Sequence, residues 1–211
     1  MQIHILTTED CWFVPYLKVL QKLCELKGDS TKVFTNISAL EEGELLFILS
    51  FYKILAKEDL VKHKHNLVIH ASDLPQGKGF SPMAWQILEG KNEIPFTLFE
   101  ANENYDAGDF YLKKTLSLSG TETYEEWRHL EGNFIIGMIL DFLQKYPNAD
   151  GFPQDGTETF YRKRTTRDDE LYPDQTLAEI FDKLRISDPT NYPSWLSFRG
   201  RKFKLKLEAW D

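Results

Sequence analysis

Cysteine is scarce in this sequence. Only Cys11 and Cys24 occur among 211 residues, and their spacing does not match a metal-binding motif. The N-terminal residues also lack the basic and then apolar layout of a secretory signal. A chain of this length can bury a substantial core without disulfides. We therefore expect a cytoplasmic protein with free thiols, built as one large domain or as a domain with a small appendage.

Long apolar runs and an excess of basic residues are also missing. The longest apolar run, Phe134 to Leu143, is interrupted by Gly137 and Asp141 and is much shorter than the ~20 residues that a membrane-spanning helix needs. The formal net charge of -8 disfavours broad binding to nucleic acid or to anionic membranes, which requires a basic surface. The composition thus predicts a soluble protein with no nucleic-acid partner and no membrane partner.

Two common catalytic motifs are absent. The segment after the first expected strand reads TTEDCW and has no glycine fingerprint for a phosphate, and no Gly-x-Ser-x-Gly elbow occurs. His63 and His65 flank the start of a strand without a third metal ligand in view. The sequence therefore gives no support to dinucleotide binding, to nucleoside-triphosphate hydrolysis or to a metal centre.

The apolar pattern of residues 1–147 predicts alternating strands and helices. An uninterrupted apolar run at residues 45–51 is typical of a central strand that is buried on both faces. Such alternation predicts an α/β fold, with a Rossmann-like, open, twisted and mostly parallel sheet flanked by helices. The expected strands are 1–6, 32–34, 45–51, 66–70, 94–101 and 109–118, and the expected helices are 12–26, 56–63, 82–88 and 121–146. In the last helix, Glu125, Glu126 and Arg128 are expected to face outward.

Residues 148–211 are less regular and predict a C-terminal extension of this core. They contain a basic, strand-like piece at 160–164, a short helix at 176–184 and two alternating runs about Gly200. The alternating runs predict a β-hairpin with one apolar face that includes Phe198, Phe203 and Trp210. We expect this hairpin to pack mainly on its own domain, and an exposed stripe would favour a homodimer.

One histidine and two carboxylates are the main candidates for chemistry. His70 ends an expected strand, where Asn66, Val68 and His70 share one face. Asp106 and Asp109 belong to a tight Asp-Ala-Gly-Asp turn between two strands that should pair in the same sheet. A histidine beside a carboxylate forms a workable acid/base pair. A strand-closing histidine and a turn-forming aspartate are the structural alternatives.

These residues also form part of a longer pattern. The stretch HASDLPQGKGFSPMAWQILEGKNEIPFTLFEANENYDAGDFY resembles the core of the formyltransferase superfamily that uses 10-formyltetrahydrofolate, over about residues 44–118. The elements that match are His70, Ser72, Leu74, Pro75 and Gly79, followed by Asp106, Gly108 and Asp109. With the Arg-Lys-Arg-Thr piece at 162–165 and the Tyr192-Pro193 hairpin, the chain is similar to sugar N-formyltransferases, of the short type associated with pseudaminic (nonulosonic) acid pathways.

The resemblance implies a reaction. An amine on a nucleotide-linked amino deoxysugar, such as a UDP-4-amino-4,6-dideoxy sugar, would attack the formyl carbon of 10-formyltetrahydrofolate and form a tetrahedral intermediate. His70 would act as a base or as an oxyanion partner, and Asp106 would orient it and help to remove the proton. No metal is needed for this chemistry.

Further site residues follow from the same resemblance. The basic run Arg162 to Arg164 would contact the substrate diphosphate, although a solvated edge strand explains such a run equally well. The residues expected to bind folate are Phe51, Leu74, Pro75, Phe99, Glu100, Ala101, Asn102 and Tyr105. The residues expected to bind the substrate are Ser72, Lys78, Arg162 and Arg164.

One position departs from the family pattern. The family places an asparagine two residues before the histidine, where its amide stabilises the oxyanion, but this sequence has Val68. Asn66 lies one pleat back, roughly 6 to 7 Å along the strand, so the donor would come from Ser72, Ser50, a backbone amide or water.

Other functions stay open. They are a glycinamide ribonucleotide-type formyltransferase and a non-catalytic module that binds folate or a nucleotide. The acidic charge and the chain length disfavour the tRNA-modifying members. The sequence does not identify the sugar, the nucleotide or the position of the amine.

Overall fold

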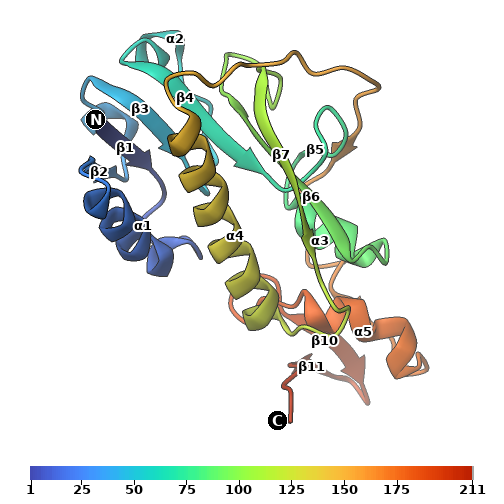
Figure 1. Ribbon diagram of the computed structural model, residues 1–211. Coiled ribbons are helices and arrows are strands. Elements are labelled where there is room, and N and C mark those ends of the chain that lie inside the picture. Colours follow the sequence, from blue (N-terminus) through green and yellow to red (C-terminus); the bar gives the residue numbers. More distant parts are fainter. Residues whose placement is uncertain (211) are drawn as a thin grey trace.

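The computed structural model describes residues 1–210, which form a six-stranded sheet with helices packed on it (Figure 1). The spatial order is β2-β1-β3-β4-β6-β7. The strands β2, β1, β3 and β4 are parallel, β6 is antiparallel to β4, and β7 is antiparallel to β6. This confirms the expected Rossmann-like, mostly parallel sheet. The strands are β1 (Gln2–Leu6), β2 (Ser30–Phe34), β3 (Gly43–Ile48), β4 (His63–His70), β6 (Glu93–Glu100) and β7 (Phe110–Ser117).

Helices cover the sheet and account for the apolar pattern. The main core lies between the sheet and the helices α1 (Val14–Leu26) and α4 (Tyr124–Lys145), and a smaller core lies on the opposite face. Strand β3 contributes to both cores, since Leu45 and Phe47 belong to the main one and Leu46 to the smaller one. That division explains the uninterrupted apolar run. The remaining short elements of this part are η1 (Ile37–Ala39), α2 (Lys57–Leu60), β5 (Lys78–Gly79) and α3 (Pro82–Leu88).

The start of α4 differs from the expectation at one residue. Glu125 and Glu126 are exposed as predicted, but the Arg128 side chain is only 24% exposed and contacts Trp12 and Trp127. Helix α4 begins with a capping box of Thr123 and Glu126. The loop after β1 and the segment after α5 pack over the first turns of α4. They enclose a face of the helix that periodicity alone would place in solvent.

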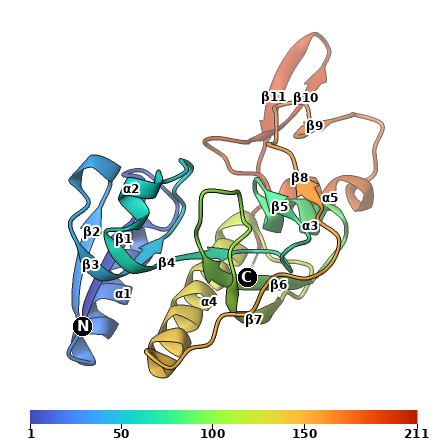
Figure 2. The same ribbon diagram turned by 90° about the horizontal axis from the view of Figure 1, so that it is seen from above.

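Residues 148–210 extend the core. Strand β8 (Phe160–Tyr161) pairs with β5 of the core, and β9 (Glu170–Leu171), β10 (Ser194–Phe198) and β11 (Arg201–Leu205) form a small sheet beside α5 (Leu177–Arg185). The base of the hairpin is fixed, because Ser194 is fully buried. Its tip projects from the molecule (Figure 2), and Phe198 and Phe203 are exposed rather than packed on the domain.

The helices between residues 1 and 210 include none with both the length and the apolar character that crossing a membrane requires.

Candidate active site

A cleft of about 880 Å³ opens beyond the carboxyl ends of β1, β3 and β4. The order of strands reverses here, because the chain passes from β1 to β2 on one side and then to β3 on the other. Ligands of open α/β sheets bind at such a position, and the volume lies in the upper part of the range for small-molecule sites, ~300–1,000 Å³. The cleft is lined by parts of residues 8–13, 48–55, 68–71, 79–84, 99–106, 124–135, 163–164 and 186–192.

His70 and Asp106 meet in the middle of this lining. The imidazole Nε2 of His70 lies 3.9 Å from Oδ2 of Asp106, and the two side chains are 11% and 14% exposed. The same Nε2 donates a hydrogen bond to the carbonyl oxygen of Gly77 at 2.9 Å. Because a carbonyl can only accept, Nε2 carries a proton, and in the neutral ring Nδ1 is the free acceptor. The sequence predicted this pair, and the fold brings it together.

The turn that carries Asp106 is held from several sides. Asp106 has a left-handed backbone with φ of 47°, and its Oδ2 accepts the Gly79 amide at 2.9 Å. The Nε2 of Gln154 donates to the carbonyl oxygens of Asp106 and Gly108, at 3.0 and 2.8 Å. A Cβ on Gly108 would lie 1.7 Å from the Glu100 carbonyl oxygen. Glycine is therefore required for the close approach of the turn to β6.

Asp109, the second carboxylate of the turn, has a different place. Its side chain is exposed and does not line the cleft. Its carbonyl oxygen accepts the Glu100 amide at 2.8 Å and closes the β6–β7 connection. Asp109 therefore contributes to the turn and not to the chemical centre.

Most of the expected folate residues border one half of the cleft, next to His70. Those that line it are Phe51, Phe99, Ala101, Asn102 and Tyr105. The side chain of Leu74 is fully buried, and Leu74 and Pro75 lie outside the cleft lining. Glu100 is also outside, since its carboxylate binds His65 Nδ1 at 3.0 Å and the Asn66 amide at 2.6 Å.

The expected substrate residues separate into two groups. Arg164 lines the cleft, whereas Ser72, Lys78 and Arg162 do not. Ser72 is 2% exposed, and Lys78 is 3% exposed with its ammonium 2.5 Å from Glu158. Arg162 is exposed and forms an ion pair with Asp168 on the outer surface. The two cations are already paired and the Ser72 side chain is covered, so these three side chains lie outside the candidate site.

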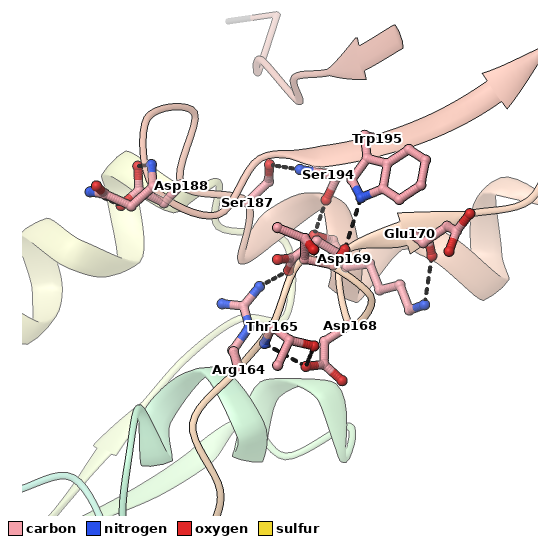
Figure 3. Close-up of polar contacts among 12 residues, drawn as sticks. Arg164, Thr165, Asp168, Asp169, Glu170, Ser187, Asp188, Ser194 and Trp195 are labelled. Carbon is pink, nitrogen blue, oxygen red and sulfur yellow. Dashed lines mark hydrogen bonds and ion pairs between the residues drawn. The ribbon is translucent and has the colours of Figure 1, made fainter. Parts of the chain in front are cut away.

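Arg164 itself is held by a buried ion pair. It contacts Asp169, which is 1% exposed, and its guanidinium lies 5.3 Å from the centre of the Tyr192 ring. Figure 3 shows Arg164 directed at Asp169, whose carbonyl oxygen accepts the Trp195 amide at 3.1 Å. Burial raises the pKa of Asp169 although Arg164 opposes the shift. The C-terminal extension thus fixes one wall of the cleft.

Sequence reasoning left out several residues of the cleft. Lys163 lines it and is exposed, and no carboxylate among residues 1–210 pairs with it. Trp12, Tyr124 and Arg128 line the same half. The basic run did signal this region, but the tertiary fold decides that Lys163 and Arg164 line the cleft whereas Arg162 pairs with Asp168 outside it.

The position of the family asparagine also lies on the cleft. Val68 lines it, whereas Asn66 is buried and its Nδ2 donates to the Leu60 carbonyl oxygen at 2.9 Å. Of the two serines considered as replacement donors, Ser50 lines the cleft and Ser72 does not.

No cluster of three or more histidine, cysteine, aspartate or glutamate side chains within residues 1–210 has a geometry suited to a metal ion.

The curated sequences that are similar to this chain include methionyl-tRNA formyltransferases. A methionyl-tRNA formyltransferase from Thermosipho africanus is 31% identical over 121 residues, which are 57% of this chain and 40% of the relative. The chain spans about half the length of the curated relatives that it matches.

Solved structures share the fold over nearly the whole chain. A methionyl-tRNA formyltransferase from Clostridium thermocellum superposes with a TM-score of 0.83 at 24% identity, covering 100% of this chain and 94% of the other. HypX from Aquifex aeolicus in complex with tetrahydrofolic acid gives 0.79 at 19%, covering 98% and 37%. A sugar N-formyltransferase from a Shewanella species gives 0.70 at 16%, covering 99% and 98%.

The family model described as "Formyl transferase" matches residues 16–132, which include His70, Asp106 and most of the core sheet. This match covers more than half of the chain, and the protein belongs to the formyl transferase family.

Proposed function

We propose that the protein transfers the formyl group of 10-formyltetrahydrofolate to the amine of a nucleotide-linked amino deoxysugar. The observation that carries this proposal is the 3.9 Å approach of His70 and Asp106 at the centre of one continuous cleft. Folate would occupy the half next to Phe51 and Tyr105, and the acceptor would occupy the half next to Trp12 and Arg164. The two ligands would then meet at His70.

The reaction is an acyl transfer between two nitrogens. The acceptor amine attacks the formyl carbon, and a tetrahedral intermediate with an oxyanion forms. The amine nitrogen then loses a proton, the bond between the carbon and N10 of the folate breaks, and N10 takes up a proton. The products are the N-formylated acceptor and tetrahydrofolate. Proton movement and oxyanion stabilisation are therefore the two demands on the protein.

His70 and Asp106 can meet these demands. The Nε2–H of His70, which donates to Gly77 here, would donate to the oxyanion. Asp106 accepts only one backbone amide through Oδ2 and would receive the amine proton, directly or through water. Val68 offers no donor, so a backbone amide or the Ser50 hydroxyl would supply the second hydrogen bond.

Folate as the donor is supported by the family and by the tetrahydrofolic acid complex of the HypX structure. The five residues at 51, 99, 101, 102 and 105 give this half an aromatic and polar lining that suits a pterin. The acceptor is supported by the similarity to sugar N-formyltransferases and by the exposed cation Lys163 in the cleft lining, which suits a diphosphate.

Methionyl-tRNA is a second candidate acceptor, because the curated relatives carry that activity in their names. The net charge of -8 opposes it, since an RNA partner is held mainly through phosphates. Glycinamide ribonucleotide, a small phosphate-bearing amine, is the remaining acceptor.

The decisive experiment offers all three acceptors to the purified protein with 10-formyltetrahydrofolate and measures the formylated product by mass spectrometry. Formylation of a UDP-4-amino-4,6-dideoxy sugar is the expected result, with little product from the other two. His70→Ala and Asp106→Asn should each lower kcat by about 10²–10⁴-fold with tetrahydrofolate binding retained. His129→Ala, at an exposed histidine of α4, is the matched control. Folate binding without turnover on any acceptor would support a non-catalytic module instead.

A further inference from the structure

Arg128 occupies an unusual position in the wall of the acceptor half of the cleft. Its guanidinium carbon lies 4.5 Å from the centre of the Trp12 ring and 4.4 Å from that of Trp127. The side chain is 24% exposed and borders the cleft. Two indoles thus hold a cation at the surface of the cavity, where water is partly excluded and a charge acts strongly on a ligand.

The polar partners of Arg128 do not use all of its donors. Nη1 donates to Glu131 Oε2 at 2.6 Å, and Nε donates to the Tyr124 hydroxyl at 3.4 Å. A guanidinium carries five N–H groups in a planar fork. Within residues 1–210 no other side chain or carbonyl accepts from it. Arg128 therefore retains donors that suit a phosphate or a carboxylate.

Glu131 is the competitor for the same cation. Its side chain is 7% exposed and it lines the cleft. Burial raises the pKa of the Glu131 carboxyl, and Arg128 opposes that shift only in part. A buried pair of this kind contributes little net stability, because desolvation offsets the attraction. A contribution to folding stability is therefore a weak explanation for the position of this pair at the wall of a cavity.

The lining of the cleft contains a second guanidinium, that of Arg164. The Tyr124 hydroxyl donates to Asp188 Oδ2 at 3.2 Å, and Asp188 bridges to Tyr192, whose ring lies beneath Arg164. Figure 3 shows Asp188 in the α5–β10 connection and Arg164 beside Asp169. Contacts through Tyr124, Asp188 and Tyr192 therefore connect the two guanidinium groups, which line the same cleft.

We propose that Arg128 binds an oxyanion of the formyl acceptor, a phosphate or a carboxylate, at a position separate from Arg164, with Glu131 as an internal competitor. This inference rests on the proposed function, because it concerns the acceptor half of the same cleft. It predicts that acceptors with two anionic groups, or with one long diphosphate, are preferred over neutral amino sugars. Arg128 is then a determinant of acceptor specificity.

The test measures binding by calorimetry with two probes, inorganic pyrophosphate for the phosphate source and D-glucuronate for the carboxylate source. Arg128→Met should weaken one probe by about 10-fold or more, as expected for a lost charged contact, and the affected probe identifies the group. Arg128→Lys should weaken it by less. Glu131→Gln should tighten the same probe several-fold, which a purely structural pair would not do. Arg201→Met, in the exposed hairpin, is the control for loss of an arginine.

Three results of the binding experiment would overturn the inference. They are no binding of either probe to the unaltered protein, Arg128→Met within twofold of it for both probes, and Glu131→Gln weakening the probe. Circular dichroism checks that each variant is folded. If Arg128→Met does not fold, Arg128→Lys and Glu131→Gln carry the test. If the unaltered protein formylates an amine and Arg128→Lys leaves the acceptor KM unchanged, this inference is refuted and the proposed function is not. If the unaltered protein formylates no acceptor but the variants show the predicted changes in probe binding, only the proposed function is refuted.

Discussion

The Nδ1 of His4 lies 2.8 Å from the Nε2 of His63 inside the sheet, where the two residues are 0% and 6% exposed. The outer nitrogens of both rings, His4 Nε2 and His63 Nδ1, are buried and have no partner. One ring donates its N–H to the other. A second proton on either ring would add a further buried N–H group without a partner, so both rings must be neutral. Burial lowers the pKa of both, to about 4 for His63.

The first prediction is that stability depends on pH through this pair. In the unfolded chain a histidine has a pKa of about 6.5, so between about pH 4 and 6.5 the unfolded state binds more protons. The contribution of His63 to the free energy of unfolding is then fully present above about pH 6.5. It falls by about 2–3 kcal/mol as the pH approaches 4. Urea unfolding at pH 7 and pH 5 measures this loss. His63→Gln should flatten the dependence, and His129→Ala should leave it intact. Equal slopes in the unaltered protein and His63→Gln would contradict the prediction.

The second prediction concerns the glycine of the Asp106 turn. A methyl group at Gly108 would meet the Glu100 carbonyl oxygen at 1.7 Å, so the turn must move away from β6. We expect Gly108→Ala to lower kcat by about 100-fold, as a displacement of about 1 Å does in an active site. Gly137→Ala is the control, because nothing lies within 4 Å of a Cβ there. Steady-state kinetics of both variants check the prediction, and full activity of Gly108→Ala would disprove the role of the turn.

The third prediction concerns Gln154, which links the C-terminal extension to the same turn. Gln154→Ala removes both hydrogen bonds to the carbonyl oxygens of Asp106 and Gly108. Since the Asp106 carboxylate would become less well positioned, we expect kcat to fall by about 10-fold with an unchanged acceptor KM. A change in KM alone would indicate that Gln154 acts on binding.

The fourth prediction separates two neighbours of the basic run. Lys163 lines the cleft without a paired carboxylate, whereas Arg162 is bound by Asp168 outside it. Lys163→Ala should raise the acceptor KM by about 5- to 10-fold, through loss of a charged contact, and Arg162→Ala should change it by less than about twofold. Tetrahydrofolate affinity serves as the control for both. Equal effects of the two substitutions would exclude selective contact by Lys163.

The sequence by itself determined most of the sheet and proposed His70 and Asp106 as the chemical pair. The apolar run at 45–51 is typical of a strand buried on both faces, and helical spacing marked α1 and α4. The resemblance to the formyltransferase superfamily gave His70 and Asp106 their expected roles, and the strand end and the glycine-containing turn placed both residues at the edge of the same sheet. These signals are local, since each depends on periodicity or turn chemistry within a few residues.

Only the tertiary structure decided which side chains reach the cleft. Lys78 is covered by the pairing of β5 with β8, a contact between residues about 80 positions apart. Arg128 has the spacing of an outward residue, yet the loop after β1 and the segment after α5 enclose it beside Trp12. The physical reason is that helical and strand periodicity fix the direction of a side chain relative to its own element. What covers that direction depends on long-range packing, which no local pattern records.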